Sequence, residues 1–168
     1  MGSTEIREVL ADTNKAVKNG VQFFFCNTNR GLEEGVFNYL EKKMEKQKYA
    51  AAWERFNFPS HMNKVKKHDV IFMYAKGVGF IGVGQASGPV KKLEPQQSGR
   101  LRKTWPDREW RIKMEEWFAW LPDEDAIRWP SKTLYRSKTF FDLTDEEHED
   151  VRIAVSKAFL RIGNPVNA

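Results

Sequence analysis

The stretch DVIFMYAKGVGFIGVGQASG, residues 69–88, is the most informative part of this chain for its fold. An apolar run over 70–75 is followed by turn-forming residues at 76–79, and an extended pattern resumes over 80–86. This pattern predicts a β-hairpin. Residues 77–82 also match the G-x-G-x-x-G spacing of dinucleotide-binding loops, but an extended glycine-rich segment follows them instead of a helix. We therefore interpret the glycines as turn, bulge and strand-bending positions.

Periodic apolar patterns continue on both sides of the hairpin and predict one α+β domain over residues 1–168. The final helix has a T-x-x-E capping box, formed by Thr144 and Glu147, at its start. The other predicted elements are a helix over 4–18, a strand over 21–26, a helix over 32–44, an irregular segment over 48–68, a polar loop over 89–104, strands over 110–120 and 139–143, and a helix over 145–162.

Composition excludes several classes of protein. The chain is 40% hydrophobic and 13% aromatic, which indicates a folded domain. We find no apolar run near the roughly 18 residues that span a bilayer, so no membrane association is expected. A single cysteine, Cys26, and three histidines predict neither a disulfide nor a zinc site. We expect a cytoplasmic, reducing location, no metal and no cofactor.

Charge is unevenly distributed along the chain. Residues 61–113 hold 12 Lys and Arg against 4 Asp and Glu, whereas residues 114–150 hold 4 against 11. A basic middle segment next to an acidic one indicates a polarised surface whose basic part attracts a polyanion. The alternative is that these charges form ordinary solvated faces.

No set of residues in the sequence forms an evident active site. The acids Asp107, Glu109, Glu115 and Glu116 lack the E-x-K pattern of metal-dependent nucleases. Cys26 ends an apolar strand, where a buried and inert thiol is expected. We therefore predict a binding protein without catalytic residues.

The tryptophans and asparagines are better candidates for function. Trp53, Trp105 and Trp110 lie in or beside basic, irregular segments, and paired aromatic rings can hold an extruded base. Packing in the core is the alternative for each of them. Asn27 and Asn29 follow the first strand, where their amides can read a base edge or form an Asx-turn.

The order of these segments resembles the PUA-like superfamily, specifically its EVE and YTH-like branch. The resemblance extends from Val21 to Leu143 and rests on FFFCNTN at 23–29, Trp53, the hairpin sequence, and RIKMEEWFAW at 111–120. It implies a small bent β-barrel flanked by helices, here the helices 4–18 and 145–162. Members of this branch flip a modified base, such as N6-methyladenine or a 5-modified cytosine, into an aromatic cage. Such domains also serve as specificity modules of modification-dependent restriction systems.

The resemblance also implies roles for individual residues. Trp53 matches the first cage wall, Asn29 the base-contacting asparagine, and either Trp105 or Trp110 the second wall. Glu54 departs from the small Ser or Thr of YTH-type members, and its carboxylate can accept a hydrogen bond from an exocyclic amine. The expected phosphate contacts come from the basic residues Lys91, Lys92, Arg100, Arg102 and Lys103.

The sequence thus predicts a non-enzymatic, base-flipping reader of a modified base, with DNA preferred over RNA as the partner. One alternative is a PUA-like RNA-binding module without modification specificity. Another is part of a modification-dependent nuclease, in which a nuclease or NTPase partner domain supplies the chemistry.

Overall fold

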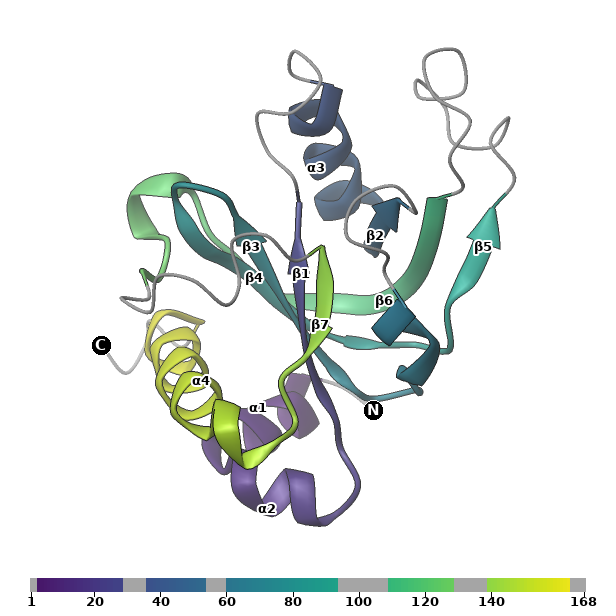
Figure 1. The fold of residues 1–168 in the computed structure, drawn as a ribbon. Helices are drawn as coiled ribbons and strands as arrows, with labels where there is room; N and C mark the ends of the chain where they lie inside the picture. Colours follow the sequence, from purple (N-terminus) through teal and green to yellow (C-terminus); the bar gives the residue numbers. More distant parts are fainter. Residues whose placement is uncertain (1–2, 29–35, 54–59, 94–108, 129–138, 164–168) are drawn as a thin grey trace.

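The computed structural model describes residues 3–28, 36–53, 60–93, 109–128 and 139–163 (Figure 1). The helices and short 3₁₀ turns are α1 (Ser3–Ala11), α2 (Thr13–Lys18), α3 (Val36–Gln47), η2 (Ser60–Lys64), η5 (Asp123–Asp125), η6 (Glu146–His148) and α4 (Glu149–Gly163). The strands are β1 (Phe23–Asn27), β2 (Tyr49–Trp53), β3 (Val70–Ala75), β4 (Gly79–Ala86), β5 (Lys91–Leu93), β6 (Glu109–Trp120) and β7 (Phe140–Asp142).

The strands form a nearly closed barrel of mixed direction. Six of them follow the order β2-β6-β4-β3-β1-β7, and β5 pairs with β6 beside this path. The pair β1–β3 is parallel, and the other ladders of the sheet are antiparallel. The curved sheet nearly closes where β2, at one end, approaches β1, next to the other end: the Cys26 thiol donates to the carbonyl oxygen of Ala51, with an Sγ···O distance of 3.6 Å. The α+β class and the barrel flanked by helices are therefore confirmed.

Two apolar clusters lie on opposite faces of the central strands, because successive side chains of a strand point to opposite faces. In β1, Phe24 and Cys26 belong to the cluster inside the barrel, together with Leu40 and Met44 of α3. Phe23 and Phe25 belong to the second cluster, with residues of α1 and α4. Figure 1 shows α1, α2 and α4 gathered on one side of the strands, with α3 beside the opposite end of β1. A fully buried aromatic strand is thus explained by cover on both faces.

The predicted hairpin is confirmed as β3 and β4, with a register irregularity after Met73. Gly77 lies in the turn with a φ of 79°, a conformation that side chains with a Cβ atom rarely adopt. Gly82 and Gly84 have a different role, because they lie opposite Trp120 and Trp117 of β6. A Cβ atom at Gly82 would lie 2.8 Å from Trp120, and one at Gly84 would lie 2.9 Å from Trp117. The alternate glycines of β4 therefore make room for two indole rings.

Two predictions about helix ends are wrong. The helix predicted over 4–18 is divided after Ala11, and Asp12 caps α2 by accepting a hydrogen bond from the backbone N–H of Lys15 at 3.1 Å. The proposed capping box does not form, because the Thr144 hydroxyl oxygen accepts from the backbone N–H of Phe23 at 3.0 Å. A tertiary contact has replaced the local one.

Arg152 of α4 holds the C-terminal helix to the end of β7. Its side chain is buried, and Nη1 lies 2.7, 2.8 and 2.6 Å from the carbonyl oxygens of Leu143, Thr144 and Asp145. Burial is the main reason that the pKa of Arg152 is lowered, and nearby acids oppose that effect. The buried guanidinium therefore satisfies several backbone acceptors where the chain turns into the helix.

Sequence reasoning missed two strands. Residues 49–53 lie in the segment expected to be irregular, and residues 91–93 lie in the segment expected to be a polar loop. Each pairs with β6, a partner more than 15 residues away in sequence. None of the helices in the described ranges is long and apolar enough to cross a membrane.

Candidate nucleic-acid interface

Two of the sequence-predicted site residues, Asn27 and Trp53, end strands at one end of the barrel. Trp53 is the last residue of β2 and lies directly opposite Glu109, the first residue of β6. Glu109 also lies opposite Leu93, the last residue of β5. Figure 1 shows these strand ends together near α3 and near the end of β1, which finishes at Asn27. We call Asn27, Trp53, Leu93 and Glu109 the barrel rim.

Asn27 and Trp53 are both buried at this rim. Asn27 is 3% exposed, and its backbone N–H donates to the carbonyl oxygen of Thr139 at 2.9 Å. Trp53 has no exposed surface and belongs to the same apolar cluster as Leu40 and Met44 of α3. A base could stack on Trp53 only after the groups that now cover the indole moved aside. The roles predicted for both residues stay predictions.

Other predicted site residues lie outside the described residues. They are the base-contacting candidates Asn29, Glu54 and Trp105 and the phosphate-contacting candidates Arg100, Arg102 and Lys103.

Trp53 and Trp110 do not face each other. In the β2–β6 ladder Trp53 is opposite Glu109, and Ala52 is opposite Trp110. Residues that are directly opposite share a face of the sheet, and the next pair lies on the other face. The two indoles therefore project from opposite faces of the ladder, so Trp110 does not face Trp53 as a second cage wall. Trp105, the other residue predicted for that wall, lies outside the described residues.

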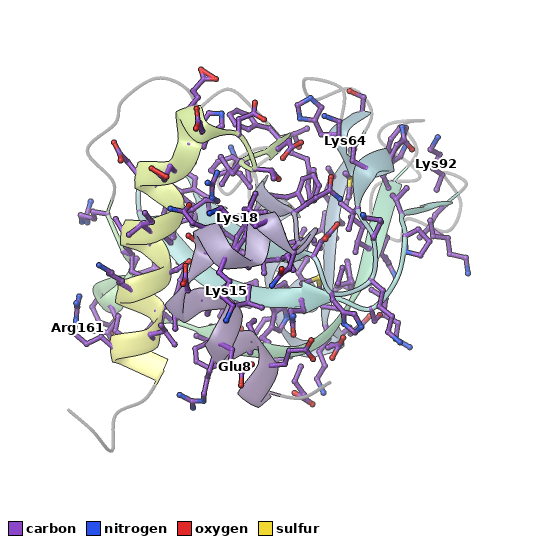
Figure 2. All side chains as sticks on the ribbon, turned by 90° about the horizontal axis from the view of Figure 1, so that it is seen from below. Glu8, Lys15, Lys18, Lys64, Lys92 and Arg161 are labelled. Carbon is purple, nitrogen blue, oxygen red and sulfur yellow. The ribbon has the colours of Figure 1, made fainter. Side chains whose placement is uncertain are left out.

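The same alternation separates two predicted phosphate contacts. Lys92 is opposite Trp110, and its Nζ lies 4.2 Å from the centroid of that ring. Lys91 is opposite Arg111 on the other face. Both lysines are exposed, and Figure 2 shows Lys92 at the edge of the molecule farthest from Arg161 of α4. Of these two lysines, Lys91 is the one that shares a face with Trp53 and Glu109.

A set of cations extends along that face. Lys91 of β5 is opposite Arg111 of β6, and Lys113 of β6 is opposite Tyr49 of β2. We call these four residues, which share one face of the three strands, the cationic face. The guanidinium carbon of Arg111 lies 3.9 Å from the centroid of the Tyr49 ring, which is the geometry of a cation–π contact. Lys91 and Lys113 are exposed, and the Arg111 side chain keeps 28% of its surface accessible. These groups can contact phosphate or a base face without rearrangement of the sheet.

Sequence reasoning missed three members of the cationic face, although a signal for them was present. It recognised Trp110, Ile112 and Met114 as one face of a strand. The intervening Arg111 and Lys113 necessarily form the other face. What the sequence did not indicate is that Tyr49 lies in a strand next to them.

Glu109 is the one acidic group at the barrel rim as defined above. It is 1% exposed, and one of its carboxylate oxygens, Oε2, accepts from Nε of Arg111 at 2.5 Å. Burial raises the pKa of Glu109, and the hydrogen bond and the charge of Arg111, with the charge of Lys43, only partly oppose this. The surroundings of Glu109 thus disfavour the charged form of its carboxylate.

Two further features bear on metal and thiol chemistry in the part of the chain that the structure describes. It contains no group of three or more His, Cys, Asp or Glu residues placed to hold a metal ion. Cys26 is buried, and burial raises the pKa of its thiol to about 12, so the nucleophilic thiolate is scarce near neutral pH.

Comparisons with known proteins add little to this geometry. No family model and no curated protein sequence matches the chain. The X-ray crystal structure of protein Atu2648 from Agrobacterium tumefaciens is similar over 86% of this chain and 94% of that one, with 12% identity and a TM-score of 0.40.

Proposed function

We propose that this protein is a nucleic-acid-binding module of the PUA-like type, related to the EVE and YTH-like branch, that reads a modified base in DNA. The observation that carries the proposal is the cationic face, where exposed cations lie beside an aromatic ring on paired strands next to the barrel rim. Lysine and arginine side chains bind the phosphates of a nucleic acid without sequence preference.

The barrel rim supports the second part of the proposal. It places an indole, an asparagine and a carboxylate at the end of the barrel next to these cations. Stacking on an aromatic ring contributes about 1–3 kcal/mol per base, and amide and carboxylate groups read base edges. A methyl group on the base adds only about 0.8 kcal/mol of apolar burial. Preference for a modified base is therefore expected to be modest unless the pocket closes tightly around it.

Binding rather than catalysis is the activity we propose. If cleavage of nucleic acid accompanies recognition, we expect a partner domain or subunit to perform it. Incubation of the isolated chain with modified DNA and divalent metal ions tests this point, and turnover by the chain itself would contradict it.

Phosphate binding is tested by fluorescence anisotropy with a single-stranded DNA oligonucleotide at several salt concentrations. Lys91→Gln and Lys113→Gln should each weaken binding and reduce the slope of log K against log salt by about 0.7, the value for one phosphate contact on a single strand. The matched control is Arg161→Gln, which removes an exposed charge at the opposite edge of the molecule (Figure 2). Failure of the wild-type protein to bind any oligonucleotide at low salt would refute the proposal.

Base recognition is tested with oligonucleotides that contain N6-methyladenine, 5-methylcytosine or no modified base. The wild-type protein should prefer a modified strand, and Trp53→Ala should remove that preference. Because deletion of a buried tryptophan costs about 3–5 kcal/mol of stability, Trp53→Phe is the companion variant that keeps an aromatic ring. Equal binding of modified and plain DNA by the wild type contradicts modified-base reading, and tighter binding to RNA than to any DNA assigns the module to RNA instead.

A further inference from the structure

The carboxylate of Glu109 is buried at the barrel rim, where it pairs with Arg111. It lies directly opposite Trp53, so the carboxylate and the indole share one face of the β2–β6 ladder. Both side chains are at most 1% exposed. Acidic side chains are rarely buried so completely, because the charged form loses its hydration.

One oxygen of this carboxylate is tied to a neighbouring side chain. Oε2 accepts a hydrogen bond from Nε of Arg111, which holds the group in one orientation. A carboxylate has acceptor capacity on both oxygens, so the oriented group can also accept from an N–H group brought to the rim.

We propose that Glu109 reads the exocyclic amine of the bound base by accepting an N–H hydrogen bond from it. This inference rests on the proposed function and adds the specificity of the same site. Sequence reasoning gave this role to Glu54, which follows Trp53 in the chain, whereas the sheet register brings Glu109 beside Trp53. The Arg111 contact makes Glu109 a fixed acceptor, which a freely rotating side chain is not.

The chemistry of the acceptor defines which bases fit. Cytosine and adenine carry an exocyclic amine that donates, whereas thymine presents a carbonyl oxygen that a carboxylate repels. N6-methyladenine keeps one N–H, and 5-methylcytosine keeps its whole amine, so Glu109 is compatible with both modifications. N6,N6-dimethyladenine has no N–H and should be rejected. The burial that raises the pKa of Glu109 also strengthens any hydrogen bond formed there.

The test uses the full chain and four oligothymidylate strands that differ only at the central base. The first pair compares 5-methylcytosine with thymine, which differ in the amine. The second pair compares N6-methyladenine with N6,N6-dimethyladenine, which differ in the last N–H. Dissociation constants are measured by fluorescence anisotropy for the wild type, for Glu109→Gln, and for Glu116→Gln. The last variant is the matched control, because Glu116 lies on the same strand with its side chain 79% exposed.

For at least one pair, we expect the wild type to bind the N–H-bearing member at least about tenfold more tightly. Glu109→Gln should reduce this ratio to about threefold or less, because its amide can turn a donor toward either partner. Glu116→Gln should keep the wild-type ratio. If Glu109→Gln fails to fold by thermal unfolding, Glu109→Asp, which withdraws the carboxylate by one methylene, should show the same loss of preference.

Each other outcome is informative. Binding without preference for the N–H-bearing member of either pair overturns the role of Glu109 and leaves the proposed function standing. A preference that survives Glu109→Gln, or equal weakening of all four strands by this variant, also overturns it. No binding to any strand refutes the proposed function itself.

Discussion

Replacement of Gly84 by alanine tests how the barrel is packed. The added Cβ atom would lie 2.9 Å from Cε3 of Trp117, 3.3 Å from Cε of Met114 and 3.4 Å from Cζ3 of Trp117. The indole cannot yield easily, because its Nε1–H donates to the carbonyl oxygen of Met44 at 3.0 Å. We therefore expect Gly84→Ala to force a shift of about 0.5 Å between β4 and the indole, a distance over which close contacts become strongly repulsive.

The magnitude follows from overpacking. Insertion of a methyl group into a packed interior costs about 1–3 kcal/mol. Because Gly84 does not have a positive φ, alanine fits the backbone there and also reduces the entropy of the unfolded chain. This second effect raises the free energy of unfolding by about 0.4–1 kcal/mol. The net loss should be about 1–2 kcal/mol, which lowers the Tm of a chain of this size by about 2–8 °C.

The assay is urea and thermal unfolding followed by circular dichroism. Gly88→Ala is the control, because nothing lies within 4 Å of a Cβ atom at that position, and its effect should stay within about 0.5 kcal/mol. In a Trp117→Phe background the smaller ring leaves space, so the cost of Gly84→Ala should fall below about 0.5 kcal/mol. The packing argument is wrong if Gly84→Ala is as stable as Gly88→Ala, or if its cost is unchanged in that background.

Four other predictions concern buried or partly buried polar groups. Because burial raises the pKa of Glu109, the native state loses stability as pH rises above the ordinary carboxyl range, and Glu109→Gln should be more stable than wild type at pH 7 but not near pH 4 in thermal unfolding. Burial acts to raise the pKa of Asp142, but hydrogen bonds from Thr144 and Lys64 outweigh burial, so the pKa is lowered. Asp142→Asn should therefore be less stable than wild type at pH 7 in thermal unfolding. This difference in stability should vanish as the pH falls below the native pKa of Asp142. Cys26, with its pKa raised to about 12, should react with iodoacetamide only in denaturant, and rapid labelling of the native protein by mass spectrometry would contradict this. Arg152→Met should cost about 3 kcal/mol or more in urea unfolding, because several buried carbonyl oxygens lose their donor.

Local patterns in the sequence were sufficient for the elements whose residues are neighbours in the chain. The hairpin of β3 and β4 was predictable from its apolar runs and turn residues, and the long strand β6 from its alternation. The aromatic strand β1 was predictable in the same way, although the reason for its continuous burial was not. These signals depend on periodicity within one segment, which a single sequence records directly.

Contacts between distant segments were not predictable in this way. The strand β2 forms because Tyr49–Trp53 pairs with β6, and the Thr144 hydroxyl accepts from Phe23 instead of capping a helix. The glycines of β4 showed their role only when Trp117 and Trp120 were found opposite them. In each case the energy comes from a partner far away in the chain, so a local pattern contains no record of it.

The same distinction between local patterns and distant contacts applies to the candidate site. Tryptophans, asparagines and a basic segment were visible in the sequence, together with a predicted barrel built on residues 69–88 that could present them. The folded chain was needed to show that Trp53 and Trp110 project from opposite faces, that Lys91 is opposite Arg111, and that Glu109 is opposite Trp53. The physical reason is register: a shift of one residue between paired strands moves every side chain to the other face, and that register is set by packing across the whole barrel.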